Sequence, residues 1–223
     1  MVMGMSALTF NNKGFSLVEL MVALVLSGMA MTAIYRGYVS IVVANDVQED
    51  SIELHQSLRV GLNSLVDDLR MAGYNPAYKK PSPTIQATSD ANSIDFSADL
   101  DPVDDTPSIY DNISYQLDTV NLELERQKNG GGFQVVMANV EALNFVYLDK
   151  DRNTIDPPLT SGLVDMIKSV QVAVVARNGN PDYSYSGNGA PYKNKQGDEI
   201  LSTPDNNYHR RVLLVEVQTR NHH

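Results

Sequence analysis

The sequence contains no cysteine among its 223 residues. This absence excludes disulfide bonds, cysteine-ligated zinc, iron–sulfur clusters and catalysis by a thiol. It does not fix the cellular compartment, because an exported protein does not require a disulfide.

Positive charge is also scarce. The chain has 17 lysine and arginine residues against 27 aspartate and glutamate residues, which gives a net charge of −10 and a pI near 4.7. An acidic surface repels phosphate, so the composition disfavours direct nucleic-acid binding by the folded body, although a local basic patch would escape this average. Apolar residues make up 43% of the chain, which is enough to bury a core, and the length suits one domain plus an extended element.

Charge is nearly absent from residues 15–35, FSLVELMVALVLSGMAMTAIY, where Glu19 is the single charged residue. As a helix, this segment spans about 30 Å, the thickness of the hydrocarbon core of a bilayer. Residues 1–14 precede it, and their single charge, Lys13, favours a cytoplasmic N-terminus. The pattern therefore predicts a membrane helix that sends the rest of the chain outward.

An ordinary secretory signal peptide is the alternative for this segment. Residues 28–30, Gly-Met-Ala, offer a small-x-small cleavage site after an apolar stretch. Two features favour the membrane helix. Glu19 lies near the start of the apolar span, where an ionised carboxylate costs about 2 kcal/mol or more unless it is paired or reaches the interface. A hydrophobic helical pattern also continues well past this site.

Residues 13–24, KGFSLVELMVAL, resemble the class III signal of type IV prepilins and pseudopilins. In that family a membrane peptidase cleaves after the glycine and methylates the new N-terminal residue, which implies cleavage between Gly14 and Phe15 and N-methylation of Phe15. The resemblance also implies that Glu19 guides docking at the fibre base and neutralises the Phe15 amine of a neighbouring subunit. A carboxylate in hydrocarbon is tolerated only beside a cation or donor, which supports the second role; the alternative is that Glu19 reaches the interface without a partner. The true start among Met1, Met3 and Met5 stays open.

A helical pattern continues beyond the membrane segment. Between residues 52 and 69, apolar residues recur at spacings of three and four, with polar residues on another face. No proline precedes Pro76, and Gly73 is placed as a C-terminal cap. These features predict one helix over residues 15–72, about 85 Å long, which suits a fibre subunit better than a globular domain.

The remainder of the chain has the alternation typical of strands. Strands are predicted at residues 112–117, 122–126, 140–148, 170–175 and 212–219. The nearly all-apolar run 170–175 predicts a strand covered on both faces, and residues 178–208, rich in Gly, Asn, Pro and Tyr, predict a long surface loop. The fold class is therefore α+β, with a long N-terminal helix packed on an antiparallel β-sheet. The predicted parts are a leader at 1–14, a transmembrane and fibre-core helix at 15–37, an amphipathic helix half at 38–73 and an antiparallel β domain at 74–223.

Residues 68–74, DLRMAGY, resemble the end of the long helix in PilW-type minor pilins, as do residues 113–115 and 145–149 in the strands. The resemblance implies a pilin-like fold and a part in type IV pilus assembly, in a priming or tip complex. The implied partners are other minor and major pilins, the prepilin peptidase, the pilus assembly platform and a tip adhesin. The implied location is the inner membrane before assembly and the fibre, periplasm or cell surface afterwards. Two alternatives stay open: a J-type pseudopilin of type II secretion, and a membrane-anchored adhesion module that binds through residues 183–192.

Two acidic segments of the sequence contain candidate metal ligands. Residues 149–156 supply oxygens at alternate positions, as calcium loops do, and the candidate ligands are Asp149, Asp151, Asn153 and Asp156. The segment lacks the glycine and the terminal glutamate of an EF-hand, so a solvated hairpin turn is the favoured interpretation and no cofactor is expected. The same holds for the second cluster, which comprises Asp99, Asp101, Asp104 and Asp105.

The sequence predicts no enzyme. Its four histidines, His55, His209, His222 and His223, fall in no metal or triad motif. The glycine run 130–132 is followed neither by Lys-Ser/Thr nor by a predicted helix, so it is not a phosphate loop.

Overall fold

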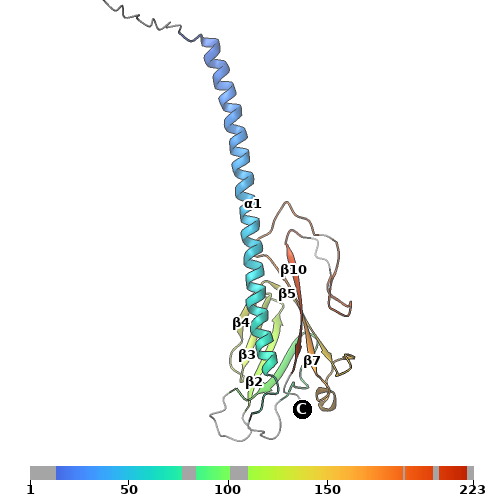
Figure 1. The fold of residues 1–223 in the computed structure, drawn as a ribbon. Coiled ribbons are helices and arrows are strands. Elements are labelled where there is room, and N and C mark those ends of the chain that lie inside the picture. The colour runs from blue at the N-terminus through green and yellow to red at the C-terminus, as the bar shows by residue number, and fades with distance from the viewer. Residues whose placement is uncertain (1–13, 77–83, 101–109, 188, 203–205, 220–223) are drawn as a thin grey trace, which may run out of the picture. The chain divides into compact units, whose positions relative to one another are not determined.

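A computed structural model of the protein describes residues 14–76, 84–100, 110–187, 189–202 and 206–219. The chain divides into two compact units, Met1–Val47 and Gln48–His223. Helix α1 (Leu17–Met71) has 55 residues and belongs to both units (Figure 1). The predicted helix over residues 15–72 is therefore confirmed.

In the first unit, the described residues are the beginning of α1 and the residues that lead into it. All of residues 14–46 are exposed, including the large apolar side chains. This part of α1 is long and apolar enough to cross a membrane, by length and composition, and none of its most apolar window is buried. A long apolar helix that the described residues leave exposed is typical of a segment that lipid or other apolar helices cover.

In the second unit, the described residues form two antiparallel four-stranded sheets and a short hairpin. The first sheet has the order β1 (Ser93–Ala98), β2 (Asp111–Asp118), β3 (Glu123–Lys128), β4 (Gln134–Ala138). The second has the order β10 (Arg210–Gln218), β7 (Ser169–Arg177), β5 (Val140–Leu148), β6 (Thr154–Ile155). The hairpin is formed by β8 (Tyr192–Lys193) and β9 (Glu199–Leu201), and one turn of helix, α2 (Ser161–Val164), precedes β7.

The two sheets adjoin where β5 passes the turn before β1. The backbone N–H of Phe145 donates to the carbonyl of Ala91 at 2.8 Å, and the Tyr147 hydroxyl donates to the carbonyl of Asp90 at 2.7 Å. The first bond satisfies a backbone N–H on the edge of β5 that β6 does not reach, because β6 pairs only with Tyr147 and Leu148. The second bond satisfies the carbonyl of Asp90 in the turn. Residues of both sheets therefore share one core cluster with the helix.

The second half of α1 lies against β2, β3 and β4 (Figure 1). Its buried residues recur at spacings of three and four: Leu54, Leu58, Gly61, Leu62, Leu65, Val66 and Leu69. They join one core cluster with residues of both sheets, among them Phe96, Tyr115 and Phe145. Burying each leucine contributes about 1.5–3 kcal/mol relative to leaving it exposed, so packing holds this half of the helix in place.

Helix α1 ends as the sequence predicts. Gly73 has φ 76°, a left-handed conformation that glycine adopts at little cost. Its N–H donates to the carbonyl of Ser97 at 3.0 Å, and the N–H of Tyr74 donates to the carbonyl of Met71 at 2.8 Å. The cap therefore stops the helix and ties its end to β1.

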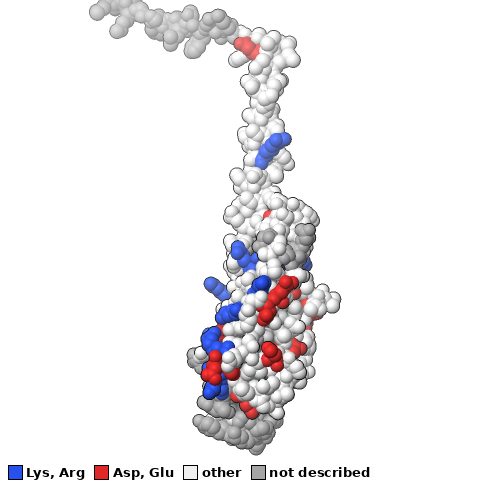
Figure 2. Space-filling view, turned by 90° about the vertical axis from the view of Figure 1, so that its right-hand side faces the viewer, with Lys and Arg blue, Asp and Glu red and all other residues white. Residues whose placement is uncertain are grey.

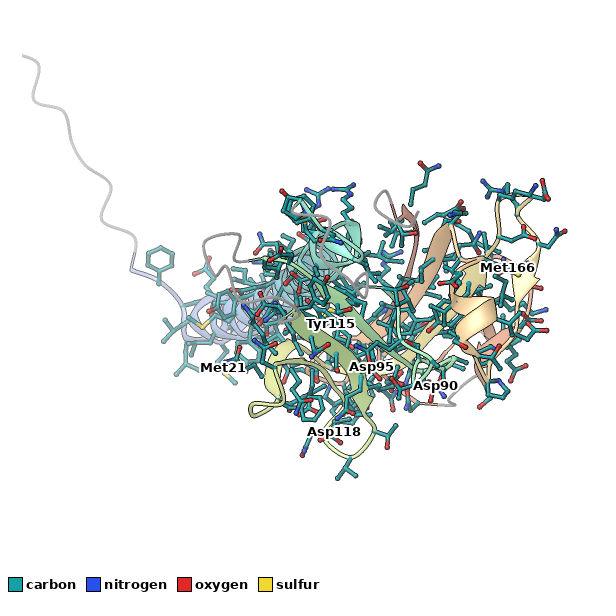
Figure 3. All side chains as sticks on the ribbon, turned by 90° about the horizontal axis from the view of Figure 1, so that it is seen from below. Met21, Asp90, Asp95, Tyr115, Asp118 and Met166 are labelled. Carbon is teal, nitrogen blue, oxygen red and sulfur yellow. The ribbon has the colours of Figure 1, made fainter. Side chains whose placement is uncertain are left out.

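One side-chain group also ties α1 to the first sheet. The Tyr115 hydroxyl on β2 donates to Asp68 Oδ2 at 2.7 Å, and Arg126 Nε on β3 donates to the same oxygen at 2.6 Å. Figure 3 shows Tyr115 within the body, and burial raises the pKa of its hydroxyl. Asp68 is the first residue of the segment that resembles PilW-type minor pilins, so that segment includes a helix–sheet anchor.

The predicted strands are confirmed, with β5 matching its predicted bounds. Leu143, Phe145 and Tyr147 are buried on one face of β5, and β7 is buried along all but its last residue, as expected of a strand covered on both faces.

The prediction of a long surface loop over residues 178–208 is wrong in part, because the segment contains β8 and β9 and packs on the second sheet. Asn194 is only 8% exposed, and its side-chain amide donates to Asn144 Oδ1 on β5 at 3.2 Å. Gln196 Nε2 donates to Gln171 Oε1 on β7 at 2.7 Å. A polar, glycine-rich composition predicts a loop, but these amides pair with amides on the sheet and cover the face of β7 that α1 does not.

Candidate functional site

The first turn of α1 is closed by two reciprocal hydrogen bonds. The backbone N–H of Ser16 donates to Glu19 Oε2 at 2.9 Å, and the backbone N–H of Glu19 donates to Ser16 Oγ at 3.2 Å. This is a capping box, in which Ser16 is the N-cap and Glu19 the third helical residue. The first N–H groups of a helix lack intrahelical acceptors, and each unsatisfied group costs several kcal/mol in lipid, so the box stabilises a helix that begins in a membrane.

Gly14 and Phe15 lie just outside this cap. Both are exposed and not helical, and Phe15 is 91% exposed. A peptide bond before the first helical turn is open to a peptidase, since no helical hydrogen bond must break first. The structure thus brings the predicted processing positions and Glu19 together within one turn of the start of α1.

The apolar part of α1 satisfies its own small polar groups. Ser27 Oγ donates to the carbonyl of Leu24, and Thr32 Oγ1 donates to the carbonyl of Gly28, each at 2.9 Å. Charged residues between 14 and 45 are limited to Glu19 and Arg36. Figure 2 shows one acidic and one basic group, well separated, on an otherwise uncharged stretch of the helix surface.

Of the candidate calcium ligands, Asp149, Asp151 and Asn153 lie in the hairpin turn between β5 and β6. Asp149 Oδ1 accepts the backbone N–H groups of Asp151 and Asn153, both at 2.8 Å, and Asp149 Oδ2 accepts the Asn153 side-chain amide at 2.9 Å. The hydrogen bonds from Asn153 lower the pKa of Asp149. Asp156 is exposed just beyond β6. The donors of the turn itself occupy the Asp149 carboxylate, and the favoured interpretation of this segment as a solvated hairpin turn without a cofactor stays a prediction.

A different acidic group lies on the first sheet, and the sequence analysis missed it. The carboxylates of Asp118, Glu123 and Glu125 lie within 4.8 Å of one another, the one such grouping found among the described residues. Asp118 and Glu123 are partners across the β2–β3 pair, and Figure 3 shows Asp118 at the periphery of the body. Strand pairing rather than sequence spacing assembles the group. Carboxylate oxygens of this kind are ligands that hard divalent cations accept.

The second predicted acidic cluster is covered by the structure only at Asp99. This residue is buried, and its backbone N–H donates to the carbonyl of Tyr74 at 2.8 Å, which links β1 to the end of α1. Asp101, Asp104 and Asp105 lie outside the described residues.

Of the histidines, His209 makes the most specific contacts. Its Nε2 lies 3.0 Å from Asp182 Oδ2, and its ring stacks on Tyr185 with the centroids 3.9 Å apart. Hydrogen bonds from Ser184, and then from His209, lower the pKa of Asp182 to about 2. His55 is exposed on α1, and His222 and His223 lie outside the described residues. The His209 contacts fasten the segment before β10 and form no triad with a nucleophile in the described part of the chain.

Comparison with known proteins bears on the N-terminal segment and on the fold. Residues 9–35 match the family described as "Prokaryotic N-terminal methylation motif". Among solved structures, the chain is similar to a type IV-like pilin from Thermus thermophilus, with a TM-score of 0.50 and 16% identity over 76% of this chain and 97% of that chain. No curated protein sequence matches the chain. The class III signal and the α+β, pilin-like fold predicted from the sequence are therefore confirmed.

Proposed function

We propose that this protein is a minor pilin that takes part in type IV pilus assembly, in a priming or tip complex. The observation that carries the proposal is a methylation motif over residues 9–35, joined to an apolar helix that is exposed throughout residues 14–46. Such a helix requires lipid before assembly and other apolar helices afterwards. The pilin-like fold and the resemblance of residues 68–74 to PilW-type proteins support the same function.

Processing creates the charge on which assembly depends. The prepilin peptidase cleaves between Gly14 and Phe15 and methylates the amine of Phe15, which remains a cation. Glu19 of a neighbouring subunit then neutralises this amine. An ionised carboxylate has about four acceptor positions, and the Ser16 N–H uses one of them, so the capping box leaves Glu19 able to accept the neighbour's ammonium group.

Before assembly, the protein spans the inner membrane once, with its N-terminus in the cytoplasm and its β domain outside. Its proposed partners are other minor and major pilins, the assembly platform and a tip adhesin. No turnover is involved: apolar helices bundle in the fibre, and the body is carried on the surface.

The test is incorporation into fibres. The full-length protein is expressed in a pilus-bearing host that lacks its own copy, and its amounts are measured in membranes and in fibres released by shear. Glu19→Ala should leave the membrane level unchanged and lower the fibre level at least tenfold, whereas Glu53→Ala, an exposed glutamate farther along α1, should match the wild type. The intact mass of the wild-type protein should equal that of a chain that begins at N-methylated Phe15. A Glu19→Ala protein present in fibres at normal levels would refute the proposal.

One observation keeps the adhesion alternative in view: Tyr183 is 85% exposed, whereas Tyr185 stacks on His209. If the protein were a singly anchored adhesion module, Tyr183→Ala would lower surface attachment while Glu19→Ala would not. The minor-pilin proposal expects the opposite.

A further inference from the structure

Arg36 is a charged residue without a partner on its own helix. Side chains three or four positions apart on a helix are within reach of each other, and for Arg36 these are Thr32, Ala33, Val39 and Ser40. The nearest acidic residue along the helix, Asp46, is ten residues away, or about 15 Å. Within the described ranges, no ion pair involves Arg36.

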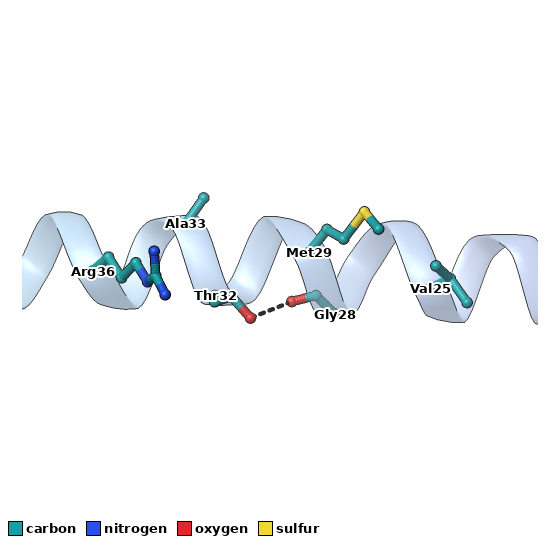
Figure 4. A pocket seen from close by; sticks show the side chains of 6 residues that line it. All are labelled: Val25, Gly28, Met29, Thr32, Ala33 and Arg36. Atoms are coloured by element: carbon teal, nitrogen blue, oxygen red, sulfur yellow. Dashed lines mark hydrogen bonds between the residues drawn. The ribbon is translucent and has the colours of Figure 1, made fainter.

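Arg36 lies at the end of one apolar face of α1. This face follows the helical spacing i, i+3, i+4, i+7, i+8, i+11 and consists of Val25, Gly28, Met29, Thr32, Ala33 and Arg36 (Figure 4). A methyl group placed on Gly28 would meet nothing within 4 Å, and Thr32 has turned its hydroxyl to the Gly28 carbonyl. Small residues let a second helix approach closely, so the guanidinium is the one polar group that such a helix must satisfy.

The need for a partner arises when the protein leaves the membrane. Arg36 follows Phe15 by 21 residues, about 31 Å along the helix, so in a bilayer its guanidinium reaches the outer headgroups. In a fibre the headgroups are gone, and the guanidinium and its five N–H donors lie among apolar helices. A charge in such surroundings requires an opposite charge.

We propose that the face from Val25 to Arg36 docks an apolar helix of a different pilin-type subunit, and that a carboxylate on that helix pairs with Arg36. The inference rests on the proposed function and adds a second charge pair to the one between Glu19 and the neighbour's Phe15. It specifies the partner by its chemistry: a membrane-type helix with an acidic residue level with Arg36.

A second copy of this chain does not meet this specification. If Glu19 of one copy is level with Phe15 of the next, the two parallel helices are shifted by four residues. Arg36 then lies opposite residue 32 or residue 40 of the other copy. Within one turn of these positions, residues 28–44, the sequence has no aspartate or glutamate. The carboxylate must therefore come from another subunit.

The first experiment measures fibre incorporation of full-length variants in the pilus-bearing host. Arg36→Gln should lower the ratio of fibre to membrane protein at least tenfold with an unchanged membrane level, and Arg36→Lys should retain about a third or more of the wild-type ratio because it keeps the charge. Ile34→Gln, which introduces the same polar group on the opposite face of the helix, is the matched control and should stay within twofold of the wild type.

The second experiment is crosslinking through a single introduced cysteine. Because the chain has no cysteine of its own, the introduced residue is its only thiol. Met29→Cys on the proposed face should crosslink to a pilin-type subunit, identified by mass spectrometry, whereas Met31→Cys on the opposite face should not. Replacing the acidic residue of that partner by arginine should restore incorporation of Arg36→Glu.

The outcomes separate the two proposals. If Glu19→Ala blocks incorporation but Arg36→Gln matches the wild type, the docking face is overturned and the proposed function stands. If Glu19→Ala and Arg36→Gln both incorporate normally, the proposed function fails as well. A Met29→Cys crosslink of twice the subunit mass would identify a second copy as the occupant and overturn the assignment to a different subunit.

Discussion

Gly61 tests how closely α1 must approach the sheet. It lies in the buried stripe of α1, where glycine lowers helix stability by about 1 kcal/mol relative to alanine. A methyl group at Gly61 would lie 2.9 Å from Met137 Cβ and 3.3 Å from Met137 Sδ on β4. The Cβ atom is fixed to the backbone of β4, so a rotation of the methionine side chain does not relieve the contact.

The magnitude follows from two opposing effects of Gly61→Ala. The gain in helix propensity is about 1 kcal/mol. Overpacking a core contact costs about 1–3 kcal/mol, because the helix or the strand must shift. The expected net change is a loss of about 1 kcal/mol in the free energy of unfolding, which lowers Tm by about 2–4 °C for a domain of this size.

The assay is thermal unfolding of the full-length protein in detergent, followed by circular dichroism. Asn63→Ala, at an exposed position two residues along, is the matched control: it gains helix propensity without a packing contact and should raise Tm slightly or leave it unchanged. If Gly61→Ala raised Tm as much as this control does, the close approach of α1 to Met137 would be refuted.

Two further predictions concern the body. Asp68→Asn removes the carboxylate that accepts from Tyr115 and pairs with Arg126, and the side chains of this ion pair are only 22% and 23% exposed. The substitution should lower the free energy of unfolding, measured in urea, by about 2 kcal/mol. Asp67→Asn, which removes an exposed ion pair, is the control and should lower it by less than about 0.5 kcal/mol. The pKa of Asp182 is lowered from 3.8 to about 2, so its contribution to stability is present above pH 3.8 and is lost as the pH falls through 2. The difference in Tm between wild type and Asp182→Asn should therefore shrink below pH 3.8 and vanish below pH 2. A difference that persisted well below pH 2 would contradict the assigned cause.

The parts of the fold that sequence predicts well are those with a strong local pattern. Helix α1 has a long apolar span, then a regular stripe and a glycine cap, and the structure ends it at Met71, one residue before the predicted end. Strands β5, β7 and β10 are nine residues each and carry clear alternation or an unbroken apolar run. In these elements the local preference and the final packing agree.

The missed elements depend on contacts that sequence spacing does not reveal. Strand β4 has five residues and a register shift opposite Leu124 and Glu125, which breaks the period of two. The β8–β9 hairpin is held by amide pairs with distant strands, such as Gln196 with Gln171. Asp118, Glu123 and Glu125 come together only once β2 and β3 have paired.

The capping box was missed for another reason. Ser16-x-x-Glu19 has the spacing of a capping box, but a charge in an apolar span predicts an ion pair and gives no sign of a local hydrogen bond. The structure gives this carboxylate a role that no neighbouring subunit supplies.

This second role sharpens the test of the proposed charge pair. Glu19→Ala removes both the cap acceptor and the negative charge, so its effect on assembly mixes a frayed first turn with a lost ion pair. Glu19→Gln separates them, because glutamine at this position retains the oxygen that accepts the Ser16 N–H but cannot neutralise an ammonium group. If the charge pair drives incorporation, Glu19→Gln should be depleted from fibres nearly as strongly as Glu19→Ala. If Glu19→Gln assembles like the wild type, the capping box is sufficient for incorporation, and incorporation does not require the intermolecular ion pair of Glu19.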